Sequence, residues 1–450
     1  MTVVRDAEVE GRRVNVRFDR DSVRQVSPHP LTPLRNEEVV DAAGGALLPG
    51  LHDHHIHLLA TARARTSVDV TAGLDALTAA PPGTGWIRAV GGADDVDAAV
   101  LDRIAPGRPV RVQHHSGAMW VLNSAGLAAA GITRASTGDD AEPGIERDAD
   151  GTPTGRLWRL DEWLRKRIDN ETPDLAALGQ ELSALGVTAV TDATPRIGAG
   201  GTEIFQATPF PQRIQFLADD PPSFGLTGPR KIVIEDHALP AYDQLREEVA
   251  DARVVGRAVA VHCVTREALL LVLAVLDEIG AAPGDRIEHA ALADADTVAR
   301  LARLRIAVVT QPGFIVNRGD RYLSELSAED LSDLYRYESF QAAGVTVVPS
   351  SDAPYGTLDP WAVMRAARDR RSAAGSRVNA KEWVSAKMVL SGYLRPLEAL
   401  HARPRRVRAG VPSDLMLLHL PLADALDDPQ AALVARTWHA APRFAASTGS

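Results

Sequence analysis

The chain has 450 residues, of which 45% are hydrophobic and 24% are charged, and its formal net charge is −10. This is the composition of an ordinary folded protein, and the length predicts one large domain with a smaller satellite. The acidic balance, without any basic run, argues against a nucleic-acid partner, and no apolar run is long enough for a membrane span. A single cysteine excludes an internal disulfide framework. Because the N-terminus has no apolar signal segment, we expect a cytoplasmic protein.

Both ends of the chain are predicted to form short strands separated by turns. At the N-terminal end these are EGRRVNVRFD and EEVVDAAGGALLPG, and RRVRAGVPSDLMLLHLP has the same character at the other end. Neither end is long enough to bury a core of its own. We therefore predict that residues 1–48 and 405–450 pair into one composite β-rich domain, with residues 49–404 inserted between them.

The inserted part alternates apolar, strand-like runs with helical patterns, which is typical of a parallel α/β sheet. Eight such runs predict a TIM-type (β/α)8 barrel. The runs cover residues 46–58, 186–194, 213–219, 230–236, 257–264, 286–290, 306–312 and 345–354.

Residues 59–180 do not follow this alternation. They are too many for one crossover, and they contain strand-like runs of their own, WIRAVGG and RPVRVQHH. We predict an insertion after the first barrel strand that folds as a lid over the mouth of the barrel.

Metal-ligand side chains stand at the ends of four of the predicted strands. His55 and His57 alternate on the first strand, so both imidazoles project to one face and can bind one metal. Such a pair alone is often just polar surface. Here His262, His289 and Asp352 end the fifth, sixth and eighth runs, and barrel enzymes place their chemistry at these strand ends. The pattern predicts a divalent metal centre.

Lys231 stands at the start of the fourth run. Arginine carries almost all of the positive charge in this chain, and the only lysines are Lys166, Lys231, Lys381 and Lys387. A surface lysine at a strand start is one interpretation. The other is that the neutral amine takes up CO2 to give a carbamate, whose oxygens bridge two metals.

Several motifs together resemble the amidohydrolase superfamily: PGLHDHHIHL, GVTAVTDA, RIEHA, SSDAP and AGVPSDLMLL. The segment HHSGAMWVLNSAGL resembles the branch that contains N-substituted formamide deformylases. The resemblance covers nearly the whole chain. It implies a hydrolase for a carbon–nitrogen bond of a small molecule, with metal-activated water as the nucleophile.

The resemblance also implies roles for individual residues. Asp352 would be a metal ligand and the proton shuttle, and His262 would be both a ligand and a catalytic residue. The other implied ligands are His55, His57 and His289, with Lys231 as the carboxylated bridge.

Other residues are candidates for the substrate pocket or for orienting the ligands. The resemblance places His115 in the pocket, with a plain loop histidine as the alternative. Trp120 would contribute an apolar wall, and Arg318, on the loop after the seventh strand, would line the pocket or be solvated. Asp192 ends the second strand, where it either orients a ligand histidine or caps the strand.

Other functions on the same scaffold stay open, namely a deaminase, an ester hydrolase or a non-catalytic metal-binding barrel. Asp352 favours an enzyme, because mere metal binding needs no acid–base group there. A deaminase would be expected to carry an acid beside His262, and VAVHCVTRE has none close to it. We expect the ligand set to hold one or two divalent metal ions, with zinc as the expected metal and manganese and iron as alternatives. A homodimer is left open.

Overall fold

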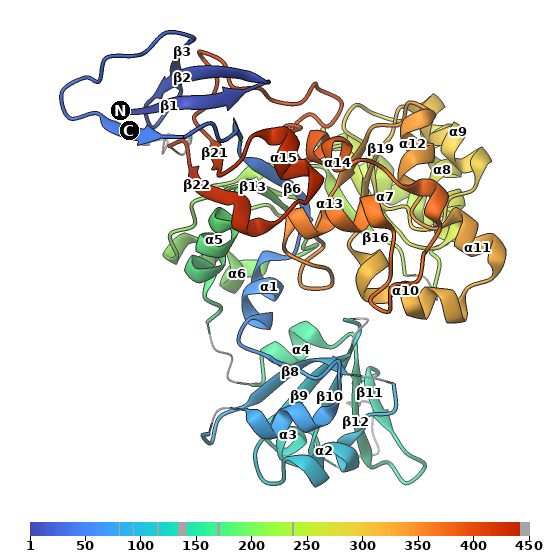
Figure 1. The fold of residues 1–450 in the computed structure, drawn as a ribbon. Helices are drawn as coiled ribbons and strands as arrows, with labels where there is room; N and C mark the ends of the chain where they lie inside the picture. The colour runs from blue at the N-terminus through green and yellow to red at the C-terminus, as the bar shows by residue number, and fades with distance from the viewer. Residues whose placement is uncertain are drawn as a thin grey trace, which may run out of the picture. The chain divides into compact units, whose positions relative to one another are not determined.

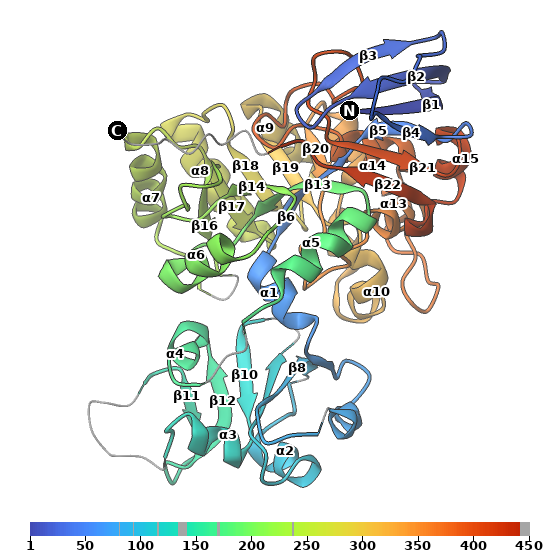
Figure 2. The same ribbon diagram turned by 90° about the vertical axis from the view of Figure 1, so that its left-hand side faces the viewer.

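The computed structural model describes residues 1–80, 82–92, 94–114, 117–133, 142–168, 172–235 and 238–441. The chain divides into two compact units (Figures 1 and 2), one of Met1–Leu58 with Leu175–Ser450 and the other of Leu59–Asp174. Within the described ranges, every helix is too short or too polar to cross a membrane.

The first unit is built around two sheets in which all strands run parallel, with the orders β15-β14-β13-β6 and β16-β17-β18-β19-β20. Each of the eight predicted runs contains one of these strands, which confirms the predicted parallel α/β fold. The strands are β6 (Leu51–Ile56), β13 (Val187–Asp192), β14 (Arg213–Phe216), β15 (Leu226–Thr227), β16 (Arg230–Val233), β17 (Val259–Cys263), β18 (Arg286–His289), β19 (Ala307–Thr310) and β20 (Val347–Pro349).

Between the described strands of the two sheets there is no regular ladder, so strand pairing does not establish a closed barrel. Isolated backbone hydrogen bonds nevertheless bridge both seams. On one side the amide of Lys231 donates to the carbonyl of Leu217 at 2.8 Å. On the other side the amide of Asp352 donates to the carbonyl of His55, also at 2.8 Å.

Helices follow the strands and cover the outside of the sheets, as α7 and α8 do beside β16 and β17 in Figure 2. In helix α8, apolar residues recur at spacings of three and four from Ala268 to Leu276, and they are buried. This spacing places them on one face of the helix, which packs against the sheet. The helices of this unit are α5 (Leu175–Ala184), α6 (Gly198–Ala207), α7 (Tyr242–Val254), α8 (Arg266–Ile279), α9 (Ala295–Leu304), α10 (Phe314–Glu325), α11 (Ala328–Asp333), α12 (Tyr337–Ala342), α13 (Pro360–Asp369), α14 (Ala386–Tyr393) and α15 (Leu422–Asp427).

The N-terminal end forms one small sheet of the order β3-β2-β1-β4, and both ends contribute to a second sheet of the order β22-β21-β5. Leu47 and Val16 from the N-terminal end share one buried cluster with Leu415 and Leu417 from the C-terminal end. The ends are therefore held together by a common apolar core. The strands are β1 (Thr2–Val9), β2 (Arg12–Phe18), β3 (Val23–Ser27), β4 (Glu38–Asp41), β5 (Leu47–Pro49), β21 (Leu415–Leu418) and β22 (Val434–Trp438).

The second unit has a sheet and a core of its own. Its six strands have the order β11-β12-β10-β9-β8-β7, and apolar side chains are buried in two clusters within it. This part of the chain thus folds as a compact unit around apolar clusters of its own. Its elements are β7 (Val68–Asp69), β8 (Ile87–Gly92), α2 (Ala98–Ile104), β9 (Val110–His114), β10 (Met119–Leu122), α3 (Ser124–Ala129), β11 (Ile145–Arg147), β12 (Pro153–Trp158) and α4 (Asp161–Arg165), with α1 (Leu58–Ala64) at its start.

The shared core of the two chain ends makes a testable prediction. Leu415→Ala removes a side chain that is 1% exposed, and such truncations cost about 2–5 kcal/mol. We expect a clearly lower melting temperature in a thermal unfolding experiment. The matched control is Leu420→Ala, because Leu420 is 40% exposed and its truncation should change the melting temperature little. Equal effects of the two substitutions would contradict the shared core.

Candidate metal centre

Three predicted ligands meet at the carboxyl ends of the parallel strands. Nitrogen atoms of His55 and His289 and a carboxylate oxygen of Asp352 lie within 4.8 Å of one another. His55 comes from β6, His289 is the last residue of β18, and Asp352 follows β20. Strands far apart in the sequence thus deliver one ligand atom each to the same point.

The other two predicted histidines border this point. Nε2 of His57 lies 3.4 Å from Oδ1 of Asp352, and the ring of His262 has its centroid 4.4 Å from that of His289. The structure therefore brings all five predicted histidine and aspartate residues together.

The loop after β20 is held in place by β6. Asp352 and Ala353 exchange backbone hydrogen bonds with His55 and His57, at 2.8 and 2.9 Å. The buried Asp53 accepts from the amide of Ser351 at 3.1 Å. Burial raises the pKa of Asp53 to about 6, whereas the hydrogen bonds that its carboxylate accepts from Ser351 and His55 act in the opposite direction and stabilise its charged form.

His289 and Asp352 both adopt the left-handed backbone conformation, with φ angles of 72° and 51°. This conformation is uncommon for residues other than glycine and is concentrated at functional sites. In a regular strand, consecutive side chains point to opposite faces. At the end of β18 the left-handed turn at His289 interrupts this alternation. The consecutive side chains of Glu288 and His289 therefore both contact histidines of the site, His55 and His262 respectively.

Two orienting residues escaped the sequence analysis. Glu288 makes a short hydrogen bond with Nδ1 of His55, and Oε1 of Gln311 accepts from Nδ1 of His289 at 2.8 Å. Each contact leaves the Nε2 atom of its histidine for a ligand, as partners of metal-bound histidines do. The signals were an acid next to His289 in RIEHA and a glutamine after the seventh strand.

The residues present fit a divalent metal. Nε2 of His55, Nε2 of His289 and Oδ1 of Asp352 are buried and have no hydrogen-bond partner, an arrangement that is costly unless another group satisfies them. Burial lowers the pKa of His55 to about 3, so its imidazole is neutral at neutral pH. Burial alone would raise the pKa of Asp352, yet the neighbouring imidazoles hold it well below its usual range. Neutral imidazoles and a carboxylate are the forms that bind metals.

Lys231 faces the same region. It pairs in register with Ala260, two residues before His262 on β17, so Lys231 and His262 lie on one face of the sheet. Its side chain is 6% exposed, and burial lowers the pKa of its amine. The interpretation of Lys231 as an ordinary surface lysine is therefore wrong.

Of the predicted pocket residues, Arg318 is next to the loop that carries Asp352. Its guanidinium donates to the carbonyl of Tyr355 at 3.3 Å and stacks 4.0 Å from the ring centroid of Phe314. The ring of Tyr355 in turn lies 5.6 Å from that of His57. Arg318 thus supports the rim of the centre.

Trp120 belongs to the second unit, where it is 5% exposed and donates to Asp161 at 2.7 Å. It packs in the core of that unit, and its contact with substrate stays a prediction. His115 lies outside the described residues. Asp192 is buried and accepts from the amides of Leu58 and Thr194 at 2.9 and 3.0 Å, so it caps the ends of β6 and β13.

Comparison with known proteins identifies the family. The model of the Amidohydrolase family matches residues 38–439. The chain belongs to this family. Membership confirms the predicted enzyme class, a hydrolase acting on carbon–nitrogen bonds other than peptide bonds.

Individual relatives are distant but cover most of the chain. The N-substituted formamide deformylase of Arthrobacter pascens is 26% identical over 464 residues, covering 85% of this chain and 84% of its own. The crystal structure of an uncharacterized metal-dependent hydrolase from Pyrococcus horikoshii OT3 has a TM-score of 0.69 at 17% identity, covering 96% of this chain and 97% of its own. The crystal structure of atrazine chlorohydrolase TrzN from Arthrobacter aurescens TC1, complexed with zinc, has a TM-score of 0.53 at 13% identity, covering 97% and 93%. These structural matches show a shared fold.

The hydrogen bond from His289 to Gln311 makes a testable prediction. Gln311→Met removes the acceptor and keeps the volume, so the ring of His289 loses its fixed orientation. We expect the affinity for Zn2+ to fall about 10–100-fold, measured by competition with a chelator. Gln215→Met is the matched control, because Gln215 is a buried glutamine of β14 that bonds Thr191 instead. Unchanged affinity in the Gln311 variant would contradict the orienting role.

Proposed function

We propose that this amidohydrolase-family member is a metal-dependent enzyme that cleaves an amide, N-formyl or cyclic amide bond of a small molecule. The observation that carries the proposal is the convergence of His55, His289 and Asp352, each of which has a buried ligand atom without a hydrogen-bond partner. A buried polar group without a hydrogen-bond partner is destabilising. A divalent cation bound between these three residues would give each of them a partner.

The proposed ligands are the five residues His55, His57, His262, His289 and Asp352. Zinc, manganese and iron all suit this set, and zinc is favoured by its presence in the chlorohydrolase of the same fold. When bound, the metal lowers the pKa of water from about 15.7 to near 7 and polarises the scissile carbonyl.

Asp352 is proposed as the proton shuttle. Its carboxylate is ionised at neutral pH and lies 3.4 Å from Nε2 of both His55 and His57. One oxygen can accept the proton of the attacking water and then deliver it to the leaving nitrogen, first as a general base and then as a general acid. His262, at the edge of the group, is proposed to hold the substrate carbonyl as well as the metal.

Lys231 is proposed to be carboxylated. Its burial favours the neutral amine, whose nitrogen attacks the carbon of CO2, and the amine proton leaves to solvent as the carbamate anion forms. A cation in this pocket would repel divalent metals, whereas the carbamate offers them two oxygens. This would make the centre binuclear.

Substrate recognition is proposed to involve an apolar wall beside the centre. Residues after β18 and β19 form a buried cluster that includes Phe314 and Tyr335, and Tyr322 and Tyr355 pack against it. Such a wall suits an N-substituted amide better than a sugar, and the similarity to a formamide deformylase agrees with it. We also propose that residues 59–180 act as a lid and that His115 contacts the substrate.

The parallel strands that lie in the eight predicted runs, which are those of the two sheets without β15, are proposed to form one closed barrel. Backbone hydrogen bonds across both seams, from Lys231 to Leu217 and from Asp352 to His55, support closure. A closed barrel accounts for ligands from β6, β17 and β18 reaching one point. The composite domain of residues 1–48 and 405–450 would then sit outside the barrel as a separate β-rich layer.

The histidine pair on the first strand tests the metal centre. His55→Ala with His57→Ala removes two ligands, so we expect elemental analysis to find at least one metal site empty and hydrolysis of a panel of N-substituted formamides to be abolished. The control pair, His29→Ala with His419→Ala, replaces two exposed histidines and should keep both metal and activity. Full metal content in the first double variant would rule out the assignment.

Lys231 provides a separate test of the metal count. Arginine stays protonated at neutral pH, so Lys231→Arg should lose the binuclear site, seen as a lower metal-to-protein ratio. Lys231→Ala leaves room for a carboxylate, so acetate or propionate should partly restore the ratio and the activity. A bare amine at Lys231 beside a single metal, in crystals grown with bicarbonate and excess zinc, would show a mononuclear centre.

A further inference from the structure

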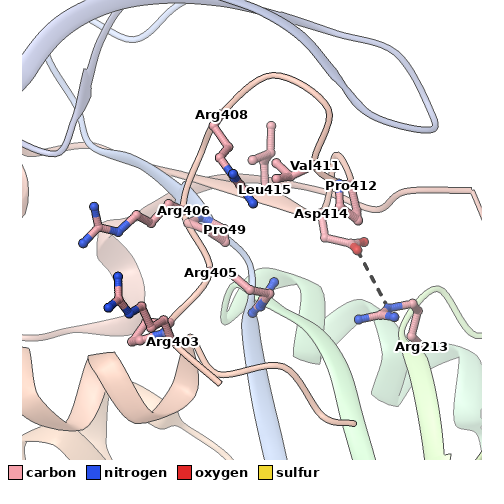
Figure 3. Close-up of a pocket in the computed structure, with 11 residues that line it drawn as sticks. Pro49, Arg213, Arg403, Arg405, Arg406, Arg408, Val411, Pro412, Asp414 and Leu415 are labelled. Carbon is pink, nitrogen blue, oxygen red and sulfur yellow. Dashed lines mark ion pairs between the residues drawn. The ribbon is translucent and has the colours of Figure 1, made fainter. Parts of the chain in front are cut away.

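A cavity lies at the amino end of the parallel strands, whereas the candidate metal centre lies at their carboxyl end. Figure 3 shows the residues that line this cavity. Its volume is about 540 Å³, within the range of small-molecule sites. Pro49, just before β6, and Arg213, the first residue of β14, both line it. His55 and His57 come at the other end of β6, so this cavity is distinct from the proposed active site.

The cavity is lined by arginines. Figure 3 shows four of them on one stretch of chain, residues 403–408, with Arg213 on β14 facing them. Asp414 is the single carboxylate among the lining residues. The five arginines are Arg213, Arg403, Arg405, Arg406 and Arg408.

Nearby carboxylates balance only part of this charge. Arg213 pairs with Glu398 at 3.0 Å and with Asp414 at 3.9 Å, and Arg406 pairs with Glu10 at 3.3 Å. In the described part of the chain, no hydrogen bond or ion pair involves the side chains of Arg403 and Arg408.

Arg405 is the most constrained of the five. One of its terminal nitrogens donates to the carbonyl of Gly50, while its Nε atom is buried and has no hydrogen-bond partner. Burial lowers the pKa of Arg405 to about 9, and the neighbouring carboxylates of Asp414 and Glu398 act against this shift. A buried, unpaired guanidinium donor is destabilising unless an anion joins it.

We propose that this arginine cavity binds a small molecule through a group with two or more negative charges, either a phosphate or a polycarboxylate. The guanidinium fork matches the oxygen spacing of both groups and forms charge-assisted hydrogen bonds with them. An acceptor placed inside would pair with the side chains of Arg403 and Arg408, the two unpaired arginines. Nucleic acid is a poor alternative, because the chain as a whole carries a net charge of −10.

The test is calorimetric titration of the full-length protein with phosphate, pyrophosphate and citrate, in buffers matched for ionic strength with sodium chloride. We expect saturable binding of at least one of these anions, and the comparison tells a phosphate site from a carboxylate site. The variant Arg403→Gln with Arg408→Gln removes two exposed, unpaired side chains, so the fold should be kept. The dissociation constant should rise roughly tenfold or more, because charge-assisted contacts are lost.

The matched control is Arg12→Gln with Arg35→Gln, which removes the same charge from two exposed arginines outside the cavity. It should bind the anion as the unaltered protein does. An equal loss of affinity in the two double variants would mean that only the overall charge of the protein matters, and it would overturn the proposal. Heats that do not saturate for any of the three anions would overturn it as well. Neither result bears on metal binding, which is measured separately.

Discussion

The hydrogen bonds between β6 and the loop after β20 are the constraint on which the site depends. They join the first and last parallel strands of the unit, nearly three hundred residues apart in the chain. The amide of Asp352 donates to His55, and the carboxylate of Asp53 holds Ser351. Without this seam, Asp352 would have no fixed position relative to the histidines, and no group of ligand atoms would form.

Burial gives the centre its chemistry. Histidines removed from water stay neutral, while Asp352 stays ionised because imidazoles surround it. The orienting residue Glu288 is buried as well, and its carboxylate contacts both His55 and the guanidinium of Arg286. A buried charge needs such partners. The residues that orient the candidate ligands are therefore as fixed in identity and position as the candidate ligands themselves.

The two ends of the parallel strands differ in charge and in construction. At the carboxyl ends, the candidate ligands come one by one from separate strands, as they do in barrel enzymes. At the amino ends, residues 403–408 bring four arginines from a single stretch that leads to β21. The shared core of the chain ends, with Leu47 against Leu415, fixes where that stretch runs. Packing of the termini thereby shapes the arginine cavity.

The sequence by itself determined the eight strand positions and the five candidate ligands, because strand periodicity is local and the ligands stand at the strand ends. Only the tertiary structure decided which side chains orient them. Gln311 lies twenty-two residues from His289, and Glu288 lies more than two hundred from His55, so no local pattern records these contacts. The left-handed turn at His289 also breaks the strand alternation from which side-chain direction is inferred. The arginine cavity depends likewise on the packing of distant segments, which composition and periodicity do not encode.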